Sequence, residues 1–202
     1  MTNSTLTQEK LHRSGIGAFF RPRDVESLGG SYYALRQLVK EGAVERVSRG
    51  LYRLADAEPS ENYSLAAVCA RVPAAIICLL SALRYHEIGT QLPRDIWIAI
   101  PRGARAPRLP GYPIRLMRFS GPSLSYGVTP IRLEDVPARI TSPARTIVDC
   151  FRYRTKIGLD VALEALRDGL RSRRATIDEI VRAAEVCRAR TVIRPYLESV
   201  VS

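Results

Sequence analysis

The sequence predicts an α+β fold in two parts, and three observations support this prediction. Within residues 1–54, short helix-like segments with capping residues precede two strand-like segments. Residues 55–62 are polar and are interrupted by a proline, which is typical of a linker. Beyond them, strand-like segments are followed by helical segments, which is the order found in an α+β domain. We therefore expect one domain at residues 1–56 and a second at residues 63–202.

The first domain should contain three helices. The first is expected over residues 5–15, where apolar residues recur at helical spacing. The second starts at Pro22, because proline suits the first turn of a helix, and it ends before a Gly-Gly pair. Ser31 is a suitable N-cap for the third helix, over residues 32–41, which a glycine ends.

A β-hairpin follows these helices. Residues 44–48 and 51–54 are strand-like, and Arg49-Gly50 between them suits a tight turn. Helices joined by a glycine-containing turn and followed by a hairpin have the layout of a winged helix-turn-helix. In that motif the second helix of the pair, here the third helix of the chain, enters the major groove of DNA.

The third helix and the hairpin carry groups suited to DNA. Polar side chains recur on one helix face, and arginine and glutamine match the edges of guanine and adenine. The hairpin supplies groups suited to phosphates. The expected DNA-binding residues are Ser31, Tyr33, Arg36, Gln37, Lys40, Arg46, Ser48, Arg49 and Arg53. The alternative is a solvated helix face on a winged domain that contacts protein, but the presence of suitable groups on both elements favours double-stranded DNA.

The charge of the chain is compatible with a nucleic-acid partner. The formal net charge is +11, and 28 of the 31 basic residues are arginine. Such a charge attracts negatively charged partners. Because the excess is distributed along the whole chain, it does not by itself point to the N-terminal domain.

Membrane, export and metal functions find no support in the sequence. No segment approaches the roughly 18 uncharged apolar residues of a membrane span, and no signal-sequence pattern is present. The cysteines form no CxxC pair and have no zinc-site spacing, so we interpret them as buried reduced thiols of a cytoplasmic protein. They are Cys69, Cys78, Cys150 and Cys187. We expect neither a metal nor a cofactor.

The second domain should begin with strands and end in helices. The expected strands are at residues 95–100, 114–119, 126–133 and 137–141. The expected helices are at residues 63–71, 81–87, from Ser142-Pro143 onward, 160–170, 176–187 and 191–200. A basic loop joins the first two strands. Its Arg102, Arg105 and Arg108 either touch phosphates or form a solvated charge run.

We expect no catalytic residue and no enzyme activity. His86 beside Glu87 is interpreted as structural, because a general base would need an acid partner and a cleft. Arg145 and Asp149 lie four residues apart and are interpreted as a scaffold pair within one helix. The serines lack a nucleophile elbow, and neither a phosphate loop nor a dinucleotide fingerprint is present.

Four segments in order resemble the AbiEi-type antitoxins. They are GAVERVSRGLYRL at 42–54, LLSALRYHEIG at 79–89, DIWIAIPRG at 95–103 and ITSPARTIVDCFR at 140–152. In the last segment, Arg145, Thr146 and Asp149 match the motif with which that family starts a helix. Ala144 stands where the family often has glutamate, so a role of that carboxylate is not transferred to this chain.

The resemblance implies a two-domain antitoxin. The N-terminal domain would repress its own operon by binding inverted repeats, with a homodimer on DNA left open. The C-terminal domain would counter a co-encoded nucleotidyltransferase-like toxin. In the namesake systems the antitoxin is described as acting without a stable complex, so direct toxin binding stays open. The alternative is a stand-alone winged-helix transcriptional regulator whose second domain senses a ligand or dimerises.

Overall fold

The chain packs into two compact units. The computed structural model describes residues 6–16, 19–57, 61–134 and 136–201. One unit comprises Met1–Pro73 and Arg132–Ala138, and the other comprises Ala74–Ile131 and Arg139–Ser202. Packing therefore groups residues 63–73 with the first unit, whereas the sequence predicted the start of the second domain there. The functional boundary near residues 55–62 stays a prediction, and Pro59 within it lies outside the described residues.

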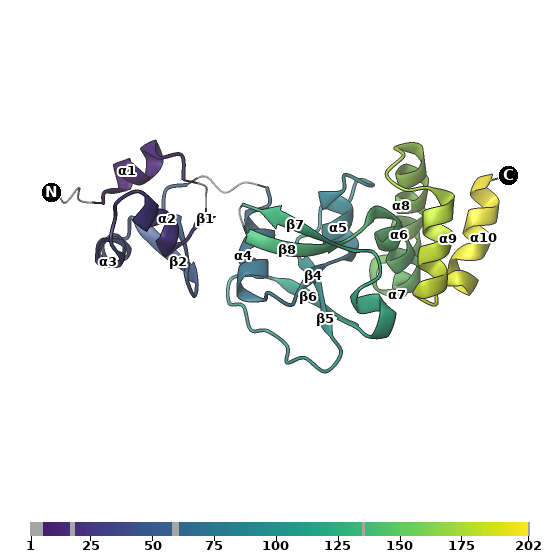
Figure 1. Ribbon diagram of the computed structural model, residues 1–202. Coiled ribbons are helices and arrows are strands. Elements are labelled where there is room, and N and C mark those ends of the chain that lie inside the picture. The colour runs from purple at the N-terminus through teal and green to yellow at the C-terminus, as the bar shows by residue number, and fades with distance from the viewer. Residues whose placement is uncertain (1–5, 17–18, 58–60, 135, 202) are drawn as a thin grey trace. The chain divides into compact units, whose positions relative to one another are not determined.

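The first unit has the element order expected of a winged helix-turn-helix (Figure 1). Its elements are α1 (Gln8–Arg13), β1 (Phe19–Phe20), α2 (Pro22–Ser27), α3 (Tyr32–Lys40), β2 (Val44–Ser48), β3 (Leu51–Leu54) and α4 (Tyr63–Arg71). The sequence did not predict β1, which adds a third strand next to β3 through the antiparallel pairs Phe19↔Arg53 and Phe20↔Tyr52.

Local contacts explain where α2 and α3 begin. The backbone N–H of Arg21 donates to Asp24 Oδ2 at 2.7 Å, and Ser31 Oγ accepts from the N–H of Ala34 at 3.1 Å. Both bonds satisfy groups that an uncapped helix start would leave without a partner. Between the helices, a Cβ at Gly30 would lie 2.7 Å from Val25 Cγ1, so only glycine allows this close approach.

One apolar core holds the first unit together. Side chains from its helices and its three-stranded sheet meet there and are almost completely removed from water. The buried members are Leu6, Leu11, Phe20, Val25, Leu35, Leu38, Val44, Tyr52 and Leu54. Since α3 contributes Leu35 and Leu38, its inner face is fixed and its opposite face is presented to solvent.

The second unit is a sheet followed by helices, as the sequence predicted. Its elements are β4 (Ile76–Ile77), α5 (Leu79–Tyr85), β5 (Ile96–Pro101), β6 (Ile114–Phe119), the short 3-10 helix η1 (Gly121–Leu124), β7 (Val128–Leu133), β8 (Val136–Thr141), α6 (Pro143–Arg152), α7 (Arg154–Ile157), α8 (Leu159–Arg171), α9 (Ile177–Val186) and α10 (Arg190–Val201). The strand order is β6-β5-β4-β8-β7. Strand β5 runs parallel to β6 and antiparallel to β4, which in turn runs parallel to β8.

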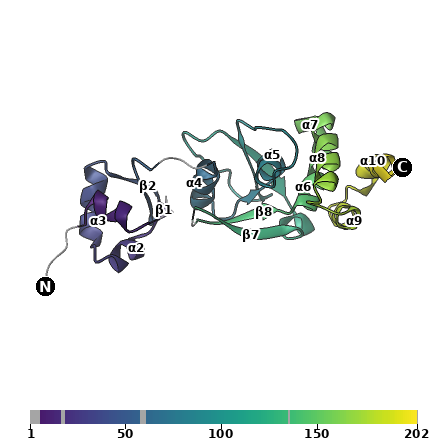
Figure 2. The same cartoon turned by 90° about the horizontal axis from the view of Figure 1, so that it is seen from above.

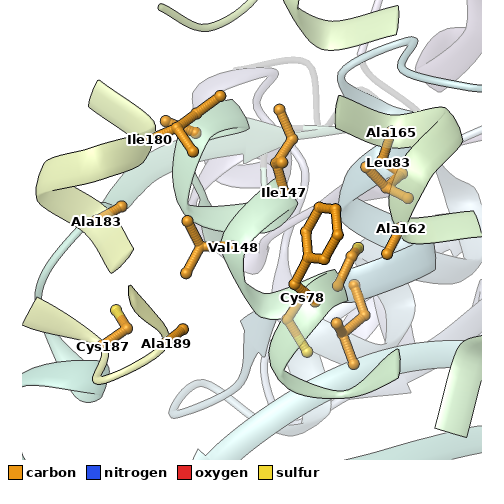
Figure 3. Close-up of a cluster of buried hydrophobic side chains, with 14 of the residues drawn as sticks. Cys78, Leu83, Ile147, Val148, Ala162, Ala165, Ile180, Ala183, Cys187 and Ala189 are labelled. Atoms are coloured by element: carbon orange, nitrogen blue, oxygen red, sulfur yellow. The ribbon is translucent and has the colours of Figure 1, made fainter. Parts of the chain in front are cut away.

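Helix α6 is the centre of the second unit. Each residue from Ala144 to Phe151 is buried. Figures 1 and 2 show α8, α9 and α10 gathered around it at the C-terminal end of the chain. In Figure 3, Ile147 and Val148 lie between Ala162 and Ala165 of α8 on one side and Ile180 of α9 on the other. The sequence predicted this helix from its cap but not its complete burial.

Two further features bear on function. Among the described residues, no helix is both long enough and apolar enough to cross a membrane. The same residues contain no cluster of three or more His, Cys, Asp or Glu side chains that would suit a metal ion. The four cysteines are all buried, as the sequence predicted, and none of them forms a disulfide.

Candidate nucleic-acid interface

The solvent face of α3 presents most of the predicted DNA-reading side chains. Tyr33 is 72% exposed, and Arg36 and Lys40 are also exposed, whereas Gln37 is half-buried. Residues at i, i+3 and i+7 share one helix face, so Tyr33, Arg36 and Lys40 form a row along it. This row combines a phenol, a guanidinium and an ammonium group.

A bulge in the hairpin sets the direction of the Val47 side chain. The pairing of β2 with β3 shifts between Arg46 and Ser48, which places Val47 at an extra position in the ladder. Val47 is buried and Arg46 is exposed. The ladder is regular up to Arg46, so the bulge does not set the direction of Arg46. It brings Val47 inward, at a position that strict alternation from Val44 would turn outward.

Helix α3 and Arg46 of the hairpin line one surface groove. This groove brings together a predicted base-reading helix and a predicted phosphate-contacting strand. Its lining residues are Tyr32, Tyr33, Arg36, Gln37, Val39, Lys40, Arg46 and Tyr52. A groove with three basic side chains and one amide has the chemistry to hold a nucleic-acid backbone and base edges.

Two tyrosines that the sequence did not single out lie in this groove. The Tyr32 and Tyr52 hydroxyls are hydrogen-bonded to each other. Burial raises the pKa of Tyr52, the Tyr32 bond raises it further, and the charges of Arg46 and Arg36 oppose the shift. The groove therefore contains two tyrosine hydroxyl groups beside its basic side chains.

The other predicted residues are in different situations. Ser31 is exposed but its hydroxyl caps α3, and Arg49 is exposed at the hairpin turn next to the half-buried Ser48. The Arg53 side chain is only 13% exposed. It pairs with Glu45 Oε2 at 3.1 Å, donates to the Ala55 carbonyl at 3.1 Å and lies 4.9 Å from the centre of the Tyr63 ring. These contacts occupy Arg53 within the unit.

Helix α4 supports the hairpin from behind. It packs against β2, and Arg71 Nε donates to the Val47 carbonyl at 2.7 Å. The acceptor is the bulged residue itself, whose carbonyl is displaced from the regular ladder. Arg71 therefore stabilises the bulge that directly follows Arg46, a role that no local sequence signal indicates.

The comparison with known proteins bears on this same segment. Residues 9–55 match the family described as transcriptional regulator, AbiEi antitoxin. The match runs from α1 through β3, so it includes α3 and the hairpin and ends before α4. No curated protein matches the chain.

The second unit holds the other three predicted motif residues. Arg145, Thr146 and Asp149 lie on α6 and are completely buried. Arg145 Nε donates to Asp149 Oδ2 at 2.9 Å, and its other nitrogens donate to the carbonyls of Tyr126 at 2.7 Å and Ser123 at 3.2 Å. The motif is thus an internal brace that joins α6 to the segment before β7.

Thr146 and the start of β7 complete this brace. Thr146 Oγ1 lies 2.7 Å from Thr141 Oγ1 and 2.8 Å from the Ser142 carbonyl, so it ties the end of β8 to α6. Gly127 has a φ of +61°, and a Cβ there would lie 2.8 Å from Arg145 Cβ. Glycine is therefore required at the point where the chain passes over Arg145.

The buried pair shifts the ionisation of its carboxylate. Burial raises the pKa of Asp149 to about 6, although the neighbouring Arg145 favours the charged form. Asp149 Oδ1 has no hydrogen-bond partner among the described residues. Because neither side chain reaches the surface, the pair cannot contact a substrate or a partner protein directly.

Proposed function

We propose that this chain is an antitoxin and transcriptional autorepressor. It binds inverted repeats in the promoter of its own gene and counteracts a co-encoded nucleotidyltransferase-like toxin. The observation that carries the DNA-binding part is the groove in which the exposed face of α3 meets Arg46 of the hairpin. The match of residues 9–55 to a family of transcriptional regulators supports the same role.

The groups on α3 divide into base contacts and backbone contacts. Arg36 has the fork that pairs with guanine O6 and N7, and Gln37 has the amide that pairs with adenine. Lys40 at the end of the helix, and Arg46 and Arg49 on the hairpin, are suited to phosphates. Arg53 is not part of this proposed interface, because its side chain is already bound to Glu45 and to the Ala55 carbonyl within the first unit.

Inverted repeats require two copies of this domain. In helix-turn-helix proteins, half-sites related by a two-fold axis are spaced by about one turn of DNA, roughly 34–36 Å. We propose that two chains occupy the two repeats, and that this blocks transcription of the operon. The identity of the neighbouring gene separates this proposal from a stand-alone regulator, which needs no toxin gene beside it.

The antitoxin part is assigned to the second unit. Since Arg145, Thr146 and Asp149 are buried, they act there by holding α6 in place. Exposed residues of the second unit would make any direct contact with the toxin. Co-expression of the chain with the neighbouring toxin tests this part, and unchanged toxicity would contradict it.

The Arg36→Ala substitution tests the DNA-binding part. Binding of the full chain to its own promoter and to random duplex DNA is measured by fluorescence anisotropy. Loss of one good base contact should weaken promoter binding by about 1–3 kcal/mol and reduce the preference for the promoter. Arg13→Ala is the matched control, because Arg13 is exposed on α1 and outside the groove. Equal losses on promoter and random DNA would show that Arg36 does not read bases.

A further inference from the structure

The second unit contains a long basic segment that the proposed operator contact does not use. No acidic residue occurs between Asp95 and Glu134, and five arginines lie in the part of this stretch that belongs to the second unit. Three of them lie in the connection between β5 and β6, which Figure 1 draws as a long loop. They are Arg102, Arg105 and Arg108.

These three guanidinium groups are exposed and unengaged. Throughout the described part of the chain, no ion pair or side-chain hydrogen bond involves any of them, unlike Arg115, which pairs with Asp95 at 2.5 Å. Their positive charge is therefore not neutralised within the unit. Successive members are three residues apart, so the Cα atoms of neighbouring members are at most about 11 Å apart.

The start of the loop, at residues 101–104, is held in place by hydrogen bonds within the unit. Arg118 on β6 donates to the carbonyls of Pro101 at 3.2 Å, Arg102 at 3.4 Å and Ala104. The Arg102 N–H donates to the Phe119 carbonyl at 2.9 Å. Pro107 and Pro110 further restrict the chain. A loop ordered in this way loses little conformational entropy when it binds.

From these observations we infer that the β5–β6 loop is a second nucleic-acid contact. Arg102, Arg105 and Arg108 bind the phosphate backbone, without base preference, through charge-assisted hydrogen bonds. This site lies in the second unit and is separate from the groove on α3. It goes beyond the proposed operator binding, because it recognises backbone phosphates of duplex DNA or of a folded RNA rather than a sequence.

The salt dependence of binding tests this inference. The full chain and the triple variant R102A/R105A/R108A are titrated into a random-sequence duplex and, separately, into a folded RNA hairpin with equal phosphate number, over a series of KCl concentrations. Each lost phosphate contact lowers the slope of log K against log[salt] by about 0.9 on duplex DNA, so the loop variant should lose about 2–3 units. A loss on the duplex identifies DNA as the source of the phosphates, and a loss on the hairpin alone identifies RNA.

A charge-matched variant serves as the control. R167A/R182A/R188A removes the same charge from exposed positions on α8, on α9 and after α9. It should reduce the slope much less than the loop variant, and R102K/R105K/R108K should restore the wild-type slope. Equal changes for the loop and control variants on both nucleic acids would overturn the inference, as would a loss that the lysine variant fails to restore. Arg36→Ala leaves this site intact, so its effect on promoter preference is distinguishable.

Discussion

At the scale of single residues, the buried pair of Arg145 and Asp149 is the most demanding feature of the second unit. Both side chains are completely removed from water, and Asp149 Oδ1 is left without a partner among the described residues. Arg145 is held by two backbone carbonyls as well as by Asp149, and its guanidinium lies 5.0 Å from the centre of the Phe119 ring. The arginine therefore has several partners and the carboxylate has one.

This asymmetry predicts unequal effects of mutation. Arg145→Met leaves a buried carboxylate and two carbonyls without their donor, and it should lower the free energy of unfolding by about 3–5 kcal/mol. Asp149→Asn keeps an oxygen to accept from Arg145 Nε and should cost less, about 1–2 kcal/mol. Urea unfolding of the full chain measures both values. A larger loss for Asp149→Asn would show that the carboxylate charge, and not the arginine network, dominates.

The surroundings of His86 lead us to expect that the free energy of unfolding depends on pH. Its Nε2 donates to the Thr141 carbonyl at 2.7 Å, at the junction of β8 and α6. Burial lowers the pKa of His86 below its ordinary value of 6.5, and Arg174 adds to this shift. As the pH falls, His86 is therefore protonated in the unfolded chain at a higher pH than in the folded chain. The stabilisation of the folded state by neutral His86 is complete above pH 6.5 and is lost as the pH falls through the folded-state pKa.

The variant His86→Gln isolates this contribution. Glutamine keeps an N–H donor for Thr141 but does not titrate, so its free energy of unfolding should fall less than that of the wild type on acidification below pH 6.5. His12→Gln is the control, since His12 is the other histidine and lies on α1. Identical pH dependence of the wild type and His86→Gln would exclude His86 as the responsible group.

At the scale of elements, the hairpin depends on α4 for its shape. Arg71 holds the carbonyl of the bulged Val47, which directly follows the groove residue Arg46. Removal of the donor by Arg71→Ala should weaken binding to promoter and random DNA alike, by about 1 kcal/mol, the typical net value of one hydrogen bond. Fluorescence anisotropy measures both affinities.

Arg71→Lys distinguishes position from charge. Lysine keeps the charge but not the Nε geometry, so it should show most of the loss seen with alanine. Full affinity of Arg71→Lys together with reduced affinity of Arg71→Ala would mean that the charge of residue 71 acts directly on DNA. A regulator domain that ends with the matched segment at residue 55 would lack this support altogether.

The elements that the sequence predicted correctly are those with local signals. Ser142-Pro143 predicted a helix that does begin at Pro143, and the capping box of Thr176 and Glu179 is formed, with the Thr176 N–H donating to Glu179 Oε2 at 2.9 Å. Strands β1 and β4 were missed because two residues show no alternation. They exist only through pairing with distant strands, as in Ile77↔Ile140.

The same distinction applies to the candidate interface. The exposed row on α3 follows from helical periodicity, which the sequence shows directly. The bulge at Val47 depends on the register between two strands, and its support by Arg71 joins residues 24 positions apart. Likewise, the ion pair that occupies Arg53 was not evident, because a strand pattern does not reveal which arginine has a neighbouring carboxylate.

At the scale of the whole molecule, the two proposed activities should be separable, but not at every position. The fragment 60–202 keeps α4, whereas the fragment 74–202 loses all of Met1–Pro73. The segment Arg132–Ala138, which is the tip of the paired strands β7 and β8, is grouped with Met1–Pro73. The tip contains Leu133 and Val136, which are 3% and 2% exposed. Uncovering these side chains favours aggregation. We expect 60–202 to be soluble and to protect cells from the toxin without binding DNA, and 74–202 to be poorly soluble.

Co-expression of each fragment with the neighbouring toxin, together with size-exclusion chromatography, checks this prediction. Full toxicity in the presence of folded, soluble 60–202 would contradict a separable antitoxin domain and would favour control of the toxin through repression alone. Equal solubility of the two fragments would show that the tip does not need residues 60–73.

The grouping of Arg132–Ala138 with the first unit also has a consequence for the synthesis of the chain. The apolar core of that unit is complete once Leu54 has been made, but its last segment, Arg132–Ala138, emerges only after most of the sheet of the second unit. Translation proceeds at about 5–20 residues per second, so the first unit waits roughly 3 to 13 s between the synthesis of residue 73 and that of residue 138. During this interval the ribosome carries a first unit that is already able to form its apolar core but lacks its last segment, while the second unit is still being synthesised.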